Sequence, residues 1–145
     1  MFEHILIATD GSEIAAKAVS GGLKLAKNLA ARVVAITASE PWFALANAQT
    51  IAINFPADEY ETATKEEAAK ILAEVRAEAL TIGVDCGTLH VTNFPAEAII
   101  ETAKAKACDL IVMGSHGRRG IARLLLGSQA TKVVRLSSVP VLVCR

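Results

Sequence analysis

The sequence predicts an α/β fold, an open parallel sheet of five strands with helices on both faces. Short apolar runs of strand length alternate along the chain with segments whose apolar residues recur at helical spacing. The strand-like runs are almost continuously apolar, as expected for parallel strands covered on both sides. Right-handed crossovers leave few strand orders, of which we expect 3-2-1-4-5. The 145 residues fit one domain, spanning residues 1–145.

The first expected elements are a strand, a helix and a second strand. Residues 4–9 (HILIAT) and residues 32–38 (RVVAITA) are short apolar runs rich in β-branched residues. Between them, Ser12 is the expected N-cap of a helix. The apolar stripe of that helix is Ile14, Ala18, Leu25 and Leu29.

The remaining elements continue the alternation. A second helix is expected from an apolar stripe at helical spacing, with Lys and Glu on its other faces. That stripe consists of Ala68, Ile71, Leu72, Val75 and Ala79. A strand is expected at 87–92, followed by a helix that Pro95 opens, with Ile99, Ile100 and Ala103 on its apolar face. The last two strands are expected at 108–114 and 139–144, with a helix from Ser128 to about Ser137 between them.

Composition excludes several classes of protein. Lys plus Arg and Asp plus Glu each number 15, so no basic field attracts nucleic acid. No apolar run approaches the roughly 20 residues of a membrane helix, and the first residues do not resemble a signal peptide. The cysteines Cys86, Cys108 and Cys144 are odd in number and far apart, so we expect reduced, mostly buried thiols. We therefore expect a cytoplasmic protein.

Two glycine-containing strand ends compete for the ligand site of this fold. They are residues 8–12 (ATDGS) and residues 113–117 (MGSHG). If the first and fourth strands are neighbours, both ends face one crevice. Glycines permit positive φ and close backbone approach, so N–H groups can converge there on an anion. Gly127 and Ser128 add the N-terminus of the last helix, although neither a Walker A loop nor a GxGxxG motif occurs.

These residues resemble the nucleotide-binding signature of the universal stress protein family. The spacing is Gly114, two residues, Gly117, nine residues, Gly127 and Ser128. ILIATDGS near the start, the stretch from FPAEAII to ATKVV and the ending VPVLVCR also resemble that family. The resemblance covers nearly the whole chain. It implies a Rossmann-like fold of the adenine nucleotide alpha hydrolase type, in the same 3-2-1-4-5 order, and ATP as the ligand.

The resemblance also implies roles for individual residues. Asp10 resembles the aspartate that binds the ribose, and the backbones of Thr9 and Ala38 would flank the adenine. Met113 would pack against the nucleoside. Gly114 and Gly117 would admit the phosphates, and Ser128 with the amides of Gln129 and Ala130 would bind their far end. Ser115, His116 and Gly127 complete the expected nucleotide site, with His116 near the phosphates. The expected cofactor is ATP, or ADP or AMP, together with Mg²⁺.

For the segment 40–60 and the arginines of the glycine-rich stretch, the sequence leaves two roles open. The apolar segment 40–60 is either a lid over the adenine or part of a subunit interface. Arg118, Arg119 and Arg123 either contact phosphate or lie in solvent. We expect His4 and His90 to be structural, and we expect neither a catalytic residue nor a metal site. Asp10 taken alone would be a turn or capping residue.

The function that we favour is a nucleotide-dependent stress-response or signalling protein. Hydrolysis would be slow at most, because no water-activating base is evident. The alternatives are an ATP hydrolase, a dimeric interaction module whose glycine loop is only structural, and, more distantly, a flavin-binding electron carrier. The family resemblance implies a homodimer in which Val141 and Val143 of the last strand meet across a two-fold axis.

Overall fold

The computed structural model describes residues 1–46, 56–118 and 125–145. Its five strands form one sheet in the order β3-β2-β1-β4-β5, and each neighbouring pair is parallel. The predicted fold class and strand order are thereby confirmed. The strands are β1 (His4–Ala8), β2 (Arg32–Ser39), β3 (Cys86–Thr92), β4 (Leu110–Gly114) and β5 (Val141–Cys144).

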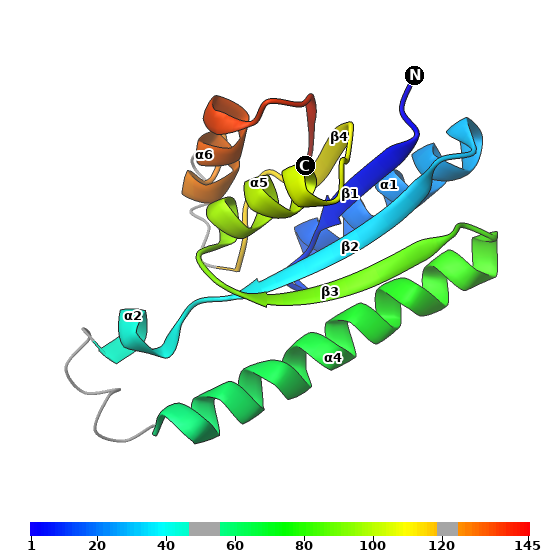
Figure 1. Ribbon diagram of the computed structural model, residues 1–145. Coiled ribbons are helices and arrows are strands. Elements are labelled where there is room, and N and C mark those ends of the chain that lie inside the picture. Colours follow the sequence, from blue (N-terminus) through cyan, green and yellow to red (C-terminus); the bar gives the residue numbers. More distant parts are fainter. Residues whose placement is uncertain (47–55, 119–124) are drawn as a thin grey trace.

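Helices cover both faces of the sheet (Figure 1). On one face lie α1 (Glu13–Leu29) and α4 (Ala57–Ile82), and on the other lie α5 (Pro95–Ala105) and α6 (Ser128–Leu136). The short helix α2 (Trp42–Ala46) follows β2 and was not predicted. Strand β5, predicted from residue 139, begins only at Val141.

The core consists of two apolar clusters, one on each face of the sheet. Ile5 and Ile7 of β1 face α1 and α4, whereas Leu6 faces α5 and α6, and all three side chains are 0% exposed. Full burial of one such side chain stabilises the fold by about 1.5–3 kcal/mol. This two-sided burial is why the strand sequences are apolar at consecutive positions rather than alternating.

Helix α1 buries a different face from the one predicted. Of the predicted stripe, Ala18 is buried, Ile14 and Leu25 are half-buried, and Leu29 is 40% exposed. The buried residues are Ala15, Ala18, Val19, Gly22, Leu23 and Ala26. Mostly small side chains face the sheet because the helix packs close to it: a Cβ on Gly22 would lie 2.7 Å from Cδ1 of Ile7. Large side chains were therefore a misleading guide to its inward face.

Helix α4 is longer than its apolar stripe. Its buried residues, Ala68, Leu72, Val75 and Ala79, belong to the predicted stripe. The helix nevertheless begins at Ala57, and its N-terminal part extends past the carboxyl end of β3 toward α2 (Figure 1). It ends at Gly83, whose φ of 75° lies in the left-handed region that glycine adopts without strain.

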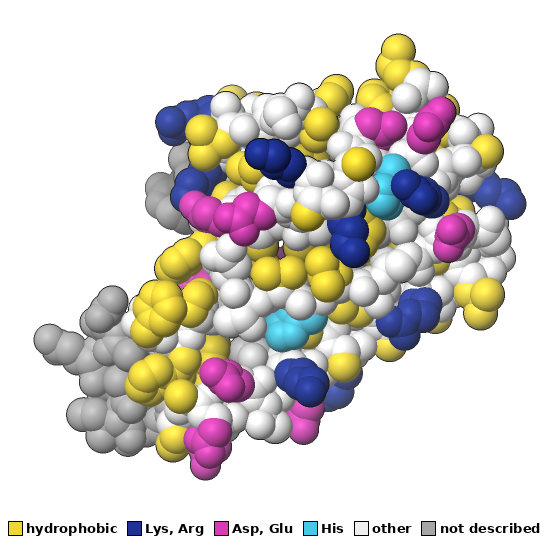
Figure 2. Space-filling model, viewed as in Figure 1, with side chains coloured by type: hydrophobic (Ala, Val, Ile, Leu, Met, Phe, Trp, Pro, Cys, Tyr) yellow, Lys and Arg dark blue, Asp and Glu magenta, His cyan; other side chains and the backbone are white. Residues whose placement is uncertain are grey.

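Charged side chains of both signs are interspersed on the face seen in Figure 2. Within the described ranges, no helix combines the length and apolar character needed to cross a membrane. All three cysteines are free, as predicted. Only Cys108 is buried, however, whereas Cys86 and Cys144 are half-buried because they lie on the two edge strands.

Candidate functional site

A cavity of about 280 Å³ lies at the carboxyl ends of β1, β2 and β4. The strand order reverses between β1 and β4, and open α/β sheets bind ligands at such a point. Eleven of the twelve sequence-predicted site residues line this cavity. They are Thr9, Asp10, Ala38, Met113, Gly114, His116, Gly117, Gly127, Ser128, Gln129 and Ala130.

The turn after β1 holds Asp10 at the edge of the cavity. Gly11 has a φ of 79°, which lets the chain reverse, and Ser12 caps α1 by accepting a hydrogen bond of 3.3 Å from the backbone N of Ala15. Oδ1 of Asp10 accepts from the N of Ser12 at 2.9 Å, and Oδ2 accepts from the N of Arg118 at 2.8 Å. Asp10 is therefore a turn residue that also links β1 to the glycine loop, residues 114–118.

The glycines of the motif serve close packing rather than a left-handed backbone. The described glycines with positive φ are Gly11 and Gly83, so Gly114 and Gly117 use the close backbone approach that glycine permits and not positive φ. A Cβ on Gly114 would lie 2.9 Å from Cγ2 of Ile14, and one on Gly117 would lie 2.9 Å from Oδ2 of Asp10. Side chains at these positions would displace the walls of the cavity.

Backbone hydrogen bonds fix the path of the chain at Ser115. Its N donates to the carbonyl of Cys144 at 2.6 Å, and its carbonyl accepts from the N of Gly127 at 2.7 Å. The start of the glycine loop is thereby tied to the end of β5 and to the start of α6. Ser115 is 2% exposed and lies behind the lining, which makes it the one predicted site residue outside the cavity wall.

Two other helices that begin at the cavity each have one N-terminal N–H bonded to a side chain. The first turn of α1 contains Glu13 and is capped by Ser12. In α5, the N of Ala96 donates to Oε1 of Gln129 at 3.1 Å, and Glu97 lies in the first turn. The side chain of Gln129 thereby joins α6 to the start of α5.

The N-terminus of α6 is different. Its N-cap is Gly127, and among the described residues no side chain caps it and no acidic residue lies in its first turn. The N–H groups at the start of a helix without such partners carry the positive end of the helix dipole. Ser128, Gln129 and Ala130 place this end at the cavity wall. This is the part of the cavity best suited to an anion.

The cavity has an apolar side and a donor-rich side. Ile36 and Ala38 of β2 and Pro95 and Ile99 of α5 line the first. The glycine loop and α6 line the second, next to β4. The sequence interpretation missed the apolar wall, namely Ala8, Ala15, Ile36, Pro95 and Ile99. One signal in the sequence could have indicated part of this wall. Pro95 and Ile99 are four residues apart, so they lie on one face of a helix that starts at a strand end.

Two ion pairs are formed by residues outside the cavity lining. Lys132 of α6 pairs with Glu97 of α5, and its hydrogen bond lowers the pKa of the Glu97 carboxyl from the ordinary value. Arg118 pairs with Glu67 of α4 at 3.1 Å, with side chains 53% and 50% exposed. Such exposed pairs contribute little stability. In this structure the guanidinium of Arg118 therefore contacts α4, while Arg119 and Arg123 lie outside the described residues.

Several other expectations concern residues around the site. Residues 47–55 of the apolar segment lie outside the described part of the chain, but Tyr60 Oη donates to the carbonyl of Glu40 at 2.6 Å. His4 contacts the carbonyl of Lys106 through Nδ1, and His90 of β3 contacts Ser39 Oγ. In the described ranges no group of three or more His, Cys, Asp and Glu could hold a metal ion.

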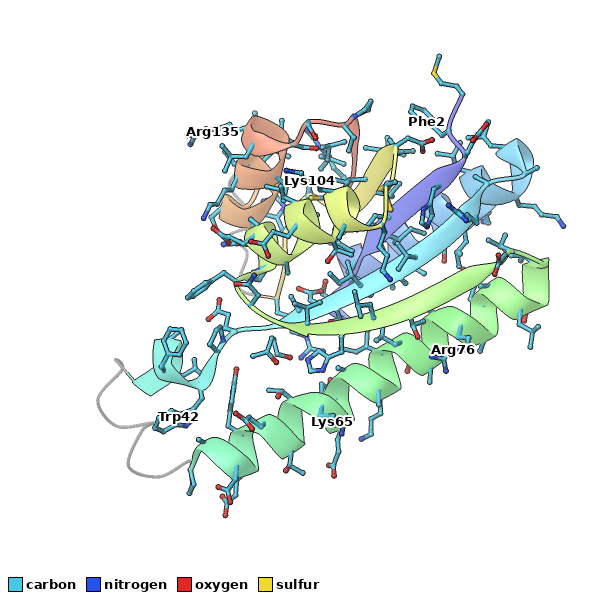
Figure 3. The ribbon with its side chains drawn as sticks, in the orientation of Figure 1. Phe2, Trp42, Lys65, Arg76, Lys104 and Arg135 are labelled. Carbon is cyan, nitrogen blue, oxygen red and sulfur yellow. The ribbon has the colours of Figure 1, made fainter. Side chains whose placement is uncertain are left out.

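Several cationic side chains lie away from the cavity. Lys104 lies in the last turn of α5 and Arg135 in the last turn of α6, and both are labelled in Figure 3. Cations stabilise the C-terminal end of a helix. Arg76 of α4, also labelled there, donates a hydrogen bond to Thr88 of β3. These charges belong to the scaffold, because none of them lines the cavity.

Comparisons with known proteins agree with this fold. The model of the universal stress protein family matches residues 1–145. Universal stress protein YxiE of Bacillus subtilis is 34% identical over 148 residues, covering 100% of both chains. The solved structure of MJ0577, a protein of Methanocaldococcus jannaschii, has a TM-score of 0.84 and 27% identity, covering 99% of this chain and 96% of that one.

A further solved structure is a universal stress protein in complex with cAMP. It has a TM-score of 0.71 and 27% identity, and the match covers 98% of this chain and 95% of that one.

Proposed function

Since the chain belongs to the universal stress protein family, we propose that it binds an adenine nucleotide in the cavity between β1 and β4. The observation that carries this proposal is the pairing of an apolar side with the uncapped N-terminus of α6 in one cavity. An adenine ring is flat and apolar on its faces, whereas phosphates are anionic. The relative crystallised in complex with cAMP supports the same class of ligand.

In this proposal the base lies on the apolar side of the cavity. Ile36, Ala38, Pro95 and Ile99 would contact the ring, with the backbones of Thr9 and Ala38 at its edge. Met113, 6% exposed, would pack against the nucleoside. Asp10 would accept hydrogen bonds from the ribose hydroxyls, since each carboxylate oxygen has a second lone pair beyond the backbone N–H it already receives.

The phosphates would lie between the glycine loop and α6. Gly114 and Gly117 leave room at the backbone, and Gly127 does the same on the α6 side, where a Cβ would lie 3.1 Å from the carbonyl of Ser115. The N–H groups at the start of α6 and the hydroxyl of Ser128 would donate to phosphate oxygens.

We assign ATP as the preferred nucleotide, with Mg²⁺ carried by its phosphates. Mg²⁺ is commonly bound through substrate phosphates and water rather than by a full protein cage. Its positive charge would reduce the mutual repulsion of the phosphate oxygens, while the N–H groups at the start of α6 and Ser128 hold the phosphates.

Hydrolysis by such a site would be slow. Asp10 is the only carboxylate that lines the described cavity, and both of its oxygens already accept backbone hydrogen bonds. No other carboxylate lines the described cavity to act as the base that activates water. The bound nucleotide would act as a signal, because its presence would alter the glycine loop that Asp10 and Arg118 connect to β1 and α4.

The experiment that tests the proposal is denaturation of the purified protein, followed by identification of the released small molecules by mass spectrometry. Near-stoichiometric adenine nucleotide supports binding. Calorimetry of the nucleotide-free protein with ATP, ADP and AMP should give measurable heat, and a turnover assay with ATP·Mg²⁺ should give little product. Absence of heat with all three nucleotides would refute the proposal.

A second candidate is an interaction module with a purely structural glycine loop. One observation favours it: Gly114 and Gly127 are required by packing against Ile14 and Ser115 even without a ligand. The same two measurements separate the candidates, since this module would release no nucleotide and bind none.

We also propose a homodimer formed through β5. This strand is at the edge of the sheet, and a bare apolar edge invites pairing. Leu142 of this strand is 42% exposed, and Val134 and Leu136 of α6 are 46% and 54% exposed. Val141 packs partly against the core, so Leu142→Lys tests the interface with less damage to the fold. Light scattering should give a dimer for the parent and a monomer for the variant.

A further inference from the structure

The first turn of α5 depends on a side chain from another helix. Its N-cap, Phe94, makes no side-chain hydrogen bond to the helix, and Pro95 has no N–H to donate. The next N–H, that of Ala96, donates to Oε1 of Gln129 in α6 at 3.1 Å. Because Ala96 is 0% exposed, its N–H relies on this acceptor rather than on water.

A second contact fastens the same turn of α5. Lys132, three residues after Gln129, pairs with Glu97, the neighbour of Ala96. Residues three apart lie on one face of a helix, so one face of α6 holds two consecutive residues of α5. The two helices lie side by side over one face of the sheet (Figure 1). The position of the start of α5 therefore depends on α6.

Gln129 lies on one side of the cavity and holds the other side. It lines the cavity next to Ser128, at the uncapped start of α6. Pro95 directly precedes Ala96 in α5, and together with Ile99 it lines the apolar side. The hydrogen bond from Ala96 to Gln129 thus fixes the spacing between the two sides.

We propose that Gln129 is a positioning residue whose side chain holds Pro95 and Ile99 against the nucleobase, so that affinity for the nucleoside depends on a residue on the phosphate side of the cavity. The inference rests on the proposed nucleotide binding and adds the residue that fits the cavity to the base. Glutamine suits this role, because its amide oxygen accepts from Ala96 without placing a negative charge near the phosphates. Glutamate would accept the same hydrogen bond but repel them.

The test compares three substitutions of Gln129 by calorimetry with adenosine and with ATP. Gln129→Leu keeps the bulk of the side chain without the acceptor, and Gln129→Asn keeps the amide on a side chain one methylene shorter. Each should lower the affinity for adenosine at least about fivefold, because the start of α5 is released. Gln129→Glu should restore adenosine affinity to within about twofold of the parent, whereas its ATP affinity should fall at least about threefold through charge repulsion.

The matched control is Thr131→Val in the same helix. The Thr131 hydroxyl donates to the carbonyl of Gly127 at 2.9 Å, a hydrogen bond that does not reach α5, so adenosine affinity should stay at the parent value. A second measurement follows hydrogen exchange of the Ala96 amide by NMR without ligand. Exchange should be at least about fivefold faster in Gln129→Leu and unchanged in Gln129→Glu and Thr131→Val.

The outcomes separate this inference from the proposed function. If the parent protein binds neither ATP nor adenosine, nucleotide binding itself is wrong. If the parent binds ATP while Gln129→Leu and Gln129→Asn keep its adenosine affinity, the inference is wrong and the proposed function stands. The same holds if Gln129→Glu loses as much adenosine affinity as Gln129→Leu, or if Ala96 exchanges at the parent rate in Gln129→Leu. A parent that binds ATP without measurable affinity for adenosine also overturns the inference, because the base would then gain nothing from α5.

Discussion

The Oδ2 atom of Asp10 accepts a hydrogen bond of 2.8 Å from the backbone N of Arg118, which lies 108 residues further along the chain. This bond joins the end of β1 to the glycine loop after β4. The same carboxylate accepts from Ser12 through Oδ1. Asp10 therefore shapes the cavity before any ligand arrives, and its substitution should affect more than one contact.

Asp10→Ala should lower the affinities for adenosine, AMP and ATP, each by at least the lost ribose contact. The ribose is common to the three ligands, and its hydroxyls lose a charged acceptor, a contact of about 1.5–3 kcal/mol. Calorimetry with each ligand measures the effect. A loss confined to ATP would mean that Asp10 acts only through the loop and does not contact the ribose.

Gly117→Val should fold but bind ATP at least about tenfold more weakly, a change of roughly 1.4 kcal/mol. The reason is the added Cβ, which would lie 2.9 Å from Oδ2 of Asp10 and force the carboxylate or the loop to move. The control is Gly87→Ala on β3, where a Cβ meets nothing within 4 Å. Parental ATP affinity in a folded Gly117→Val protein would show that the loop is structural only.

Ser128→Ala should weaken ATP binding while adenosine binding stays unchanged. The Ser128 hydroxyl lies at the start of α6, on the donor-rich side of the cavity, and loss of one hydrogen bond to a charged group costs about 1.5–3 kcal/mol. Ser138→Ala, in the exposed turn after α6, is the matched control. Equal losses for ATP and adenosine would place Ser128 against the nucleoside instead.

The adjacent glycines of α1 should respond oppositely to alanine. At Gly21 a Cβ meets nothing within 4 Å, so Gly21→Ala should stabilise the protein by about 0.5–1 kcal/mol through helix propensity. At Gly22 the Cβ would lie 2.7 Å from Ile7, which is 0% exposed, so Gly22→Ala should destabilise it by about 1–3 kcal/mol. Urea unfolding midpoints measure both, and a stabilised Gly22→Ala would contradict the close packing of α1.

Cys108 should be the slowest of the three cysteines to react with iodoacetamide at pH 8. Burial, with a contribution from the charge of Asp109, raises the pKa of its thiol to about 11. Only the thiolate reacts, so below that value the rate should rise about tenfold for each added pH unit. Mass spectrometry of the alkylated peptides gives the order. Labelling of Cys108 ahead of Cys86 and Cys144 in the folded protein would contradict this picture.

Most of the architecture could be predicted from the sequence, because strand and helix periods are local properties. The runs at 4–9 and 32–38 and the stripe from Ala68 to Ala79 each correspond to an observed element. Errors occurred where long-range packing overrides the local signal. The inward face of α1 is an example, since close approach to the sheet favours Ala15 and Gly22 over Leu29.

For the candidate site, the sequence by itself indicated the residues of the glycine loop, the turn after β1 and the start of α6, but not the apolar wall. The alternation of elements leaves few strand orders, and the family resemblance implies 3-2-1-4-5, the observed order, which brings Asp10 and Gly117 to one crevice. Only the tertiary structure decided what they do there. It shows that Gly117 makes room for a carboxylate, that Ser115 lies behind the wall, and that Nε2 of His116 has no partner among the described residues. The physical reason is that hydrogen-bond satisfaction and van der Waals contact depend on atoms far apart in the chain, whereas periodicity and motif spacing depend on neighbours.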